Sequence, residues 1–159
     1  MKVERQGHNE CILATIAALT ETPLREVRNK ACVLAGVETD DWNSVVTGRF
    51  RSKFWDVSES VSMFFGGPNM WAMVGPMGRT IVPGSTVKRI DPYGMRKLPD
   101  KGRGTITVKS TRRGTAISHI MPWKDGMIYD PENPKTPMTF RQYRKIKPRM
   151  KVWIVTIEE

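Results

Sequence analysis

The chain contains three residues of the types that cooperate in nucleophilic catalysis: Cys11, His119 and Asp130. Cys11 begins the run 11–19, which is apolar almost all round and therefore predicts a helix buried inside the domain. A thiol in the first turn of such a helix faces the positive end of the helix dipole, which favours the nucleophilic thiolate. A nearby histidine would complete the activated Cys–His pair of covalent catalysis.

The position of the histidine follows from a predicted hairpin. Asp125-Gly126 lies between two apolar runs, and Asp-Gly in that setting is a strong hairpin signal. If Asp125-Gly126 forms a two-residue turn, Lys124 faces Met127. The register of the whole hairpin is then set by this pair.

In that register Met121 faces Asp130, and His119 lies two residues from Met121 on the same face. His119 and Asp130 become diagonal neighbours, about 7–8 Å apart at Cα. Asp130 could then orient the imidazole, fix its tautomer and stabilise its cation.

Acyl transfer also needs hydrogen-bond donors aimed at the oxyanion. Gln6, five residues before Cys11, is the candidate, beside the backbone N–H of Cys11. Asn9 and His8 are alternatives for this donor. His8 is the only other histidine in the chain, so it also competes with His119 for the role of general base.

Cys11 also has a purely structural interpretation. A cysteine in an apolar run more often fills a core than carries out catalysis. We interpret Cys32 in this way, since it lies near the apolar stripe of a second predicted helix. A disulfide between Cys11 and Cys32 is not expected in a reducing compartment.

The elements that must position these residues change along the chain from helices to strands. Expected helices cover 11–19 with Asn9 as N-cap, 23–35 with Pro23 first and Gly36 as the stop, and 140–145. Between them, Asp40 or Asp41 could cap a helix that runs to about 49, and Ser58 could cap a short helix that runs to about 65. Expected strands cover 80–82, 86–90, 105–110, 115–121, 127–129 and 151–157. This order predicts a single α+β domain over 1–159, with a helical part at about 1–66 and a β-rich part at about 80–159.

Length and composition narrow the class of protein. The chain has 159 residues, of which 26% are charged. No apolar run approaches the roughly 18 residues of a membrane span, and no basic-then-apolar signal peptide is present. Two cysteines are too few for a disulfide-built secreted domain. We expect a soluble cytoplasmic protein without membrane association, and since no zinc-ligand spacing is present, without a metal or cofactor.

The net positive charge of the chain lies in its second half. Residues 1–80 hold 9 Lys/Arg and 9 Asp/Glu, whereas residues 81–159 hold 17 and 7. A surface formed by this basic half would attract polyanions, either nucleic acid or an acidic protein partner. A merely solvated, solubilising face explains the same charge equally well. No nucleic-acid-binding motif accompanies it.

The segment Gln6-Gly-His-Asn-Glu-Cys11-Ile-Leu-Ala-Thr-Ile-Ala-Ala-Leu19 resembles the N-terminal signature of papain-like cysteine peptidases. The most similar group is that of the bacteriocin-processing (double-glycine) peptidases. Segments 104–108, 119–121 and 125–131 resemble that group's histidine-bearing strand and the strand ending in Asp-Pro. The resemblance covers about 5–30 and 103–132. It departs from the family at Ile12-Leu13, where Gly and Pro often follow the cysteine.

The resemblance implies a papain-like cysteine peptidase fold, with N-terminal helices packed on a C-terminal antiparallel β-sheet. It also implies roles: Cys11 as nucleophile, His119 as general base and then acid, Asp130 as the orienting residue, and Gln6 as oxyanion donor.

Three functions remain open from the sequence. The first is a thiol hydrolase that cleaves a peptide, isopeptide or related amide bond of a peptide or protein substrate through an acyl-enzyme at Cys11. The second is the same fold with weak or lost catalysis, acting as a basic binding protein for nucleic acid or an acidic protein. The third is an acyl or glutamyl transferase that uses the same residues.

Overall fold

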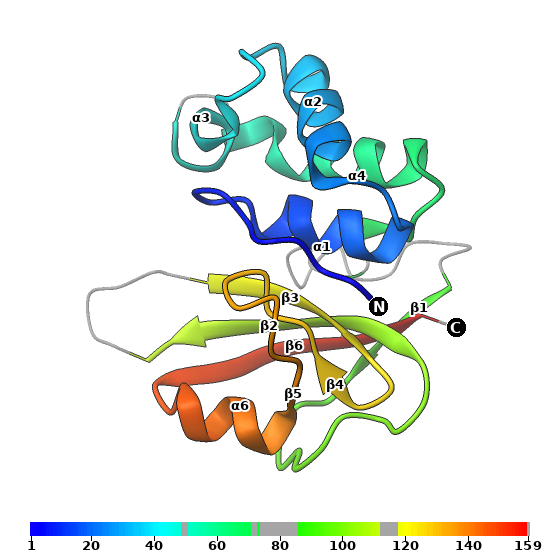
Figure 1. The fold of residues 1–159 in the computed structure, drawn as a ribbon, viewed down its shortest axis with the longest axis vertical. Coiled ribbons are helices and arrows are strands. Elements are labelled where there is room, and N and C mark those ends of the chain that lie inside the picture. Colours follow the sequence, from blue (N-terminus) through cyan, green and yellow to red (C-terminus); the bar gives the residue numbers. More distant parts are fainter. Residues whose placement is uncertain (49–50, 71–72, 74–85, 112–117, 159) are drawn as a thin grey trace.

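The computed structural model describes residues 1–48, 51–70, 73, 86–111 and 118–158 (Figure 1). The helical part contains α1 (Cys11–Thr20), α2 (Leu24–Ala35), α3 (Trp42–Thr47), the 3-10 helix η1 (Arg51–Lys53) and α4 (Phe54–Phe64). The later part contains β1 (Val87–Ile90), β2 (Arg103–Ser110), β3 (Ser118–Lys124), β4 (Met127–Ile128), β5 (Met138–Thr139), α6 (Phe140–Ile146) and β6 (Met150–Glu158). The α+β class predicted from the sequence is confirmed.

The strands form a six-stranded sheet in the order β1-β6-β2-β3-β4-β5. Every described pair in it is antiparallel. The long strands β2, β3 and β6 make its centre, whereas β4 and β5 are only two residues long. Among the described residues, no helix is both long enough and apolar enough to cross a membrane.

Each face of the sheet is covered by helices (Figure 1). On one face, α1 lies against β3, and a core of residues from α1, α2, α3 and α4 includes Ile120 of β3. On the other face, α6 contributes Phe140 and Tyr143 to a second core with Met121 and Trp123 of β3. Successive residues of β3 therefore point into different cores, as side chains along a strand must.

Helix α1 is the innermost helix of the fold. Its eight residues from Ile12 to Leu19 are all buried. The sequence predicted this from a run that is apolar almost all round, because only a helix covered on all sides can bury such a surface. The helical layer covers one side of α1, and the sheet covers the other.

The boundaries of two helices differ from the sequence prediction. Glu10, rather than Asn9, is the N-cap of α1, because Asn9 adopts a left-handed conformation with φ 56 and its amide donates to Asn43 Oδ1 at 2.6 Å. Helix α4 begins at Phe54, four residues before the predicted start at Ser58. The Ser58 hydroxyl donates to the Phe54 carbonyl at 2.6 Å, so Ser58 lies inside the helix instead of capping it.

Other predicted elements agree more closely. Gly36 ends α2 with φ 72, although Pro23 is the N-cap and not the first helical residue. Thr139 and Gln142 form a capping box that starts α6 at the predicted residue. Strand β5 was not predicted. The predicted strand 80–82 and residues 115–117 of another lie outside the described residues.

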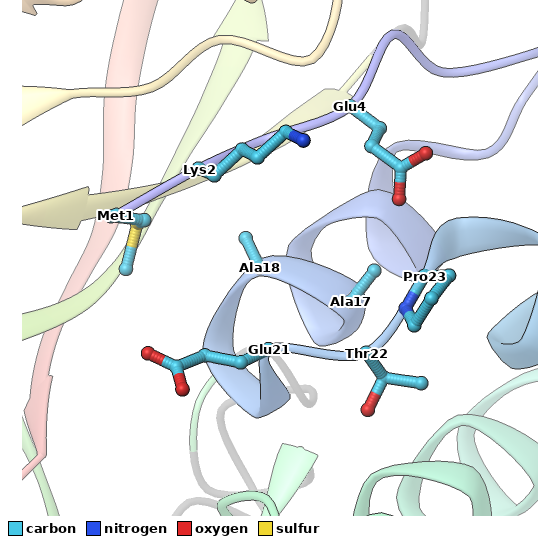
Figure 2. Close-up of a pocket in the computed structure, with 8 residues that line it drawn as sticks. All are labelled: Met1, Lys2, Glu4, Ala17, Ala18, Glu21, Thr22 and Pro23. Carbon is cyan, nitrogen blue, oxygen red and sulfur yellow. The ribbon is translucent and has the colours of Figure 1, made fainter.

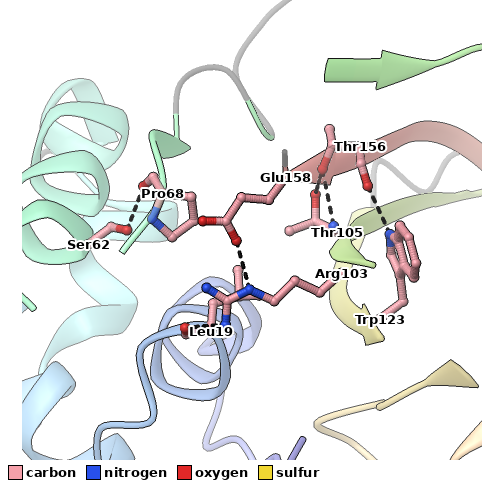
Figure 3. A network of polar contacts seen from close by, with 8 residues as sticks. All are labelled: Leu19, Ser62, Pro68, Arg103, Thr105, Trp123, Thr156 and Glu158. Carbon is pink, nitrogen blue, oxygen red and sulfur yellow. Dashed lines mark hydrogen bonds and ion pairs between the residues drawn. The ribbon is translucent and has the colours of Figure 1, made fainter. Parts of the chain in front are cut away.

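A polar network ties the end of α1 to the sheet (Figure 3). Arg103 of β2 donates from Nη1 to the Leu19 carbonyl at 2.9 Å and pairs through Nε with Glu158 at 2.8 Å. Beside it, Trp123 donates to the Thr156 carbonyl at 2.9 Å. Carbonyls in the last turn of a helix lack partners within it, so Arg103 satisfies one of them and holds that end of α1 in place.

Gly104 allows the close approach of β2 and β6. A Cβ atom at this position would lie 1.9 Å from the Thr156 carbonyl oxygen, which belongs to the backbone and cannot turn aside. We expect Gly104→Ala to lower the free energy of unfolding by about 3 kcal/mol, as overpacking of a rigid site does. Urea unfolding followed by circular dichroism measures this.

Gly94→Ala is the matched control. Gly94 has φ +71 and open space around the missing Cβ, so only the cost of a left-handed alanine, about 1 kcal/mol, applies there. Equal losses for the two variants would mean that β2 and β6 separate easily and that the contact at Gly104 is unimportant.

Candidate active site

The hairpin of β3 and β4 brings His119 and Asp130 together. Lys124 pairs with Met127 and Trp123 with Ile128, which confirms the predicted two-residue turn and its register. His119 Nε2 lies 2.8 Å from Asp130 Oδ1. The two residues are 6% and 2% exposed, so this polar pair is almost shielded from water.

Cys11 meets this pair from the opposite side. It is the first residue of α1, it is half-buried, and it lines the same cleft as His119, whose pKa it helps to raise. Because Nε2 of the ring faces Asp130, Nδ1 is the nitrogen left for the thiol. The Thr15 hydroxyl fixes this approach, since it lies 2.8 Å from the Cys11 carbonyl and 3.4 Å from the Ile120 carbonyl of β3.

The electrostatics of the site favour a protonated imidazole. Burial lowers the pKa of His119, but the hydrogen bonds to Asp130 and Cys11 and the charges of both outweigh it and raise the pKa to about 10. Burial raises the pKa of Asp130, but the hydrogen bond and charge of His119 hold it below its usual value. At neutral pH the two residues therefore form an ion pair, which suits a neighbouring thiolate.

The site lies where the sheet has an open edge. The short strand β4 pairs with β3 only at Trp123 and Lys124, and not beside His119. Next to that gap the N-terminal segment docks on the chain after Asp130. Gln6 donates its backbone N–H to the Pro131 carbonyl at 3.0 Å, and this bond carries the Gln6 side chain to the site.

Cys11 and His119 line a cleft of about 210 Å³. Its other walls come from the N-terminal segment, the chain after Asp130, the start of β3, and the α6 to β6 region: Gln6, Asn9, Ser118, Glu132, Tyr143, Lys147 and Met150. A ligand in this cleft would therefore reach both the Cys11 thiol and the His119 imidazole.

Among the candidate oxyanion donors, Gln6 is the best placed. Its Oε1 is buried and has no hydrogen-bond partner among the described residues, so the amide is free to orient toward a ligand. Asn9 also reaches the cleft, but its amide is engaged with Asn43. His8 is exposed and lines neither this cleft nor the next, so His119 is the histidine that lies with Cys11.

Cys11 also lines a second cleft, of about 230 Å³. It shares Asn9, Cys11 and Ser118 with the first cleft, but its remaining walls are mainly apolar: Ile12, Val46, Phe54, Trp55 and Ile120, with Arg51. An extended ligand that occupied both clefts would cross the Cys11 sulfur.

Sequence reasoning missed how Glu10 holds the catalytic segment. The Glu10 carboxylate is buried, pairs with both Nε and Nη2 of Arg28 on α2, and accepts the Gly7 N–H at 2.7 Å. The hydrogen bond to Glu10 raises the pKa of the Arg28 guanidinium. The sequence places Arg28 directly after the buried stripe residue Val27, on the border of the apolar face, but this position does not indicate the partner of Arg28.

A metal ion could be held only at the site itself, among the described residues. His119, Asp130 and Glu132 have potential ligand atoms within 4.8 Å of one another. The His119 and Asp130 atoms are already hydrogen-bonded to each other, so a metal there would have to replace that bond.

A pocket larger than either cleft at Cys11 lies elsewhere. It measures about 720 Å³ and is bounded by the first residues of the chain and by the end of α1 with its following turn (Figure 2). Its lining residues are Met1, Lys2, Glu4, Ala17, Ala18, Glu21, Thr22 and Pro23. They include neither cysteine nor histidine, so this pocket offers no nucleophile.

Comparison with known proteins gives no relative from which roles could be transferred. Searches against protein-family models, curated proteins and solved structures each returned no match. The functional argument therefore rests on the geometry of the site.

The His119–Asp130 pair makes stability depend on pH. The pKa of His119 is raised from 6.5 to about 10, so its contribution is full below pH 6.5 and is lost as the pH rises toward 10. The pKa of Asp130 is lowered from 3.8, so its contribution is lost only in stronger acid. We expect the difference in free energy of unfolding between the wild type and His119→Gln to be largest near pH 5–6 and to shrink toward pH 10. A difference that stays constant over this range would contradict the protonated pair.

Removal of the Glu10 carboxylate should loosen the segment that leads to Cys11. We expect Glu10→Ala to lower the free energy of unfolding by about 2 kcal/mol, less than for a fully buried pair because Arg28 is partly exposed. The exposed Glu38 has no described side-chain contact, so Glu38→Ala serves as the control. Chemical denaturation of both variants checks this, and equal stabilities would show that the Glu10 pair is dispensable.

Proposed function

We propose that the chain is a papain-like thiol hydrolase that cleaves a peptide, isopeptide or related amide bond through an acyl-enzyme at Cys11. One observation carries the proposal: the first residue of a buried helix is a cysteine that lines one cleft with a histidine held by a buried aspartate. The order Cys, His, Asp along the chain and the resemblance around Cys11 support the papain-like assignment.

In the proposed mechanism, the Cys11 thiolate attacks the carbonyl carbon and forms a C–S bond, and the carbonyl electrons move to oxygen. The oxyanion accepts hydrogen bonds from the Cys11 backbone N–H, which has no partner within the first turn of the helix, and from the Gln6 amide. His119 then gives its Nδ1 proton to the leaving nitrogen as the C–N bond breaks. Asp130 keeps the ring oriented throughout.

The acyl-enzyme is then resolved by a second nucleophile. In hydrolysis, His119 takes a proton from water, the resulting hydroxide attacks the thioester, and the carboxylic acid leaves with Cys11 restored. If an amine entered instead, the same residues would catalyse acyl or glutamyl transfer. The two clefts that Cys11 lines leave room for an acyl chain and for an entering group.

Alkylation with iodoacetamide tests the proposal directly. We expect Cys11 to react at least about 100-fold faster than Cys32 at pH 6, since thiolates and not thiols are alkylated. Cys32 is an internal reference, because it is fully buried and burial raises the pKa of its thiol. Peptide mass mapping at successive times gives both rates.

Variants then show whether the reactivity depends on the proposed pair. His119→Ala and Asp130→Asn should each slow alkylation of Cys11 at pH 6 by about tenfold or more, whereas His8→Ala should leave it unchanged. If Cys11 reacts no faster than Cys32, or if His119→Ala has no effect, the hydrolase proposal fails.

A further inference from the structure

The end of the chain carries a concentrated positive charge that the proposed catalysis does not use. Residues 133–157 include seven Lys/Arg and no Asp/Glu. They span β5, α6 and nearly all of β6. Among the described residues, neither Arg144 nor Lys151 forms an ion pair, and the same is true of Arg96 in the loop before β2.

These three cations border one cleft of about 580 Å³ between the 91–96 loop, α6 and β6. Arg96, Arg144 and Lys151 are exposed along its walls, together with Tyr93, which is 93% exposed. The only carboxylate in the lining is that of Asp91, which accepts the Tyr93 backbone N–H at 2.9 Å. The walls of this basic cleft therefore favour an anionic ligand.

The rest of the lining of the basic cleft is apolar. Met95, Phe140, Met150 and Val152 all line it, and all four belong to or pack against the core on the α6 face of the sheet. Methionine side chains adapt to ligands of different shapes. A ligand that matches both the cations and the apolar lining of the basic cleft carries acidic groups and apolar side chains together.

The basic cleft shares one lining residue with the candidate active site. Met150 lines both the basic cleft and the cleft that contains Cys11 and His119. Lys147, which ends α6, lines the latter cleft as well. An extended chain that lay in the basic cleft could therefore pass Met150 and reach the thiol.

We propose that the basic cleft binds an acidic, partly apolar peptide segment of the protein substrate and so directs a neighbouring bond to Cys11; this inference rests on the proposed hydrolase function. Charge complementarity and the apolar lining support a peptide. Single-stranded nucleic acid is bound mainly by successive aromatic side chains on which bases stack. Here only Tyr93 presents an exposed ring, because Phe140 is 3% exposed.

A binding experiment tests the ligand class. The probe is a fluorescein-labelled 16-residue peptide of Glu, Leu, Gly and Ser, compared with the same peptide in which Gln replaces Glu. The protein is the full chain carrying Cys11→Ala, so that the probe stays intact. We expect the Glu peptide to bind at least about tenfold more tightly than the Gln peptide and to weaken as salt rises.

Charge reversal locates the binding site. The variant Arg96→Glu/Arg144→Glu/Lys151→Glu should bind the Glu peptide at least about tenfold more weakly. The matched control is Arg25→Glu/Lys101→Glu/Lys124→Glu, which alters three exposed cations away from the basic cleft and changes the net charge equally. It should change affinity by less than about threefold. Equal losses in both variants would show a diffuse charge effect and overturn the proposal.

A thymidine 16-mer, labelled in the same way, tests the other class of polyanion. If it binds more tightly than the Glu peptide and loses affinity in the cleft variant, the cleft is a nucleic-acid site and the peptide proposal is wrong.

Directed labelling tests the link to Cys11. The Glu peptide carries a chloroacetyl group on a flexible linker, and free chloroacetamide gives the intrinsic reactivity of Cys11. We expect the peptide to label Cys11 at least about tenfold faster than chloroacetamide at equal concentration, because binding raises the local concentration of the reagent. The cleft variant should lose this acceleration but keep its rate with chloroacetamide.

The two proposals fail in different ways in this experiment. If chloroacetamide labels Cys11 no faster than Cys32, the hydrolase proposal fails. If Cys11 is reactive but the Glu peptide gives no acceleration, the hydrolase proposal stands and the substrate-binding cleft is ruled out.

Discussion

The burial of α1 between the helical layer and the sheet is the constraint on which the other features depend. Its turns can only be covered if β3 lies against one side and α2 and α4 against the other. Arg103 binds the Leu19 carbonyl in its last turn, and Thr15 ties its first turns to β3. As a result, the N-terminus of α1 ends at one place on the sheet, and Cys11 has a defined position relative to His119.

Two charge pairs lie near this N-terminus, and each has a different effect on the site. Glu10 and Arg28 are bonded at two nitrogens, so their effect is mechanical: they hold the segment from Gly7 to the helix. His119 and Asp130 share one hydrogen bond and leave the second ring nitrogen available, so their effect is chemical. Together the two pairs place the rigid backbone before Cys11 beside the His119 side chain, which can exchange protons.

Short-range patterns made much of this predictable. Asp125-Gly126 set the hairpin register, and the register was sufficient to place His119 beside Asp130. The apolar run from Ile12 predicted a helix buried on all sides. The Glu10–Arg28 pair was not predicted, because it depends on the relative orientation of two helices, and a local pattern contains no such information. The same is true of β5, whose two residues pair with β4 and lie against α6.

The central position of α1 also affects how the chain folds during synthesis. α2 and α4 follow α1 closely and can cover one of its sides early. β3 begins only at Ser118, about a hundred residues after Cys11, so the other side of α1 stays exposed to water while the ribosome makes the intervening chain. Translation at about 5–20 residues per second makes this interval several seconds long.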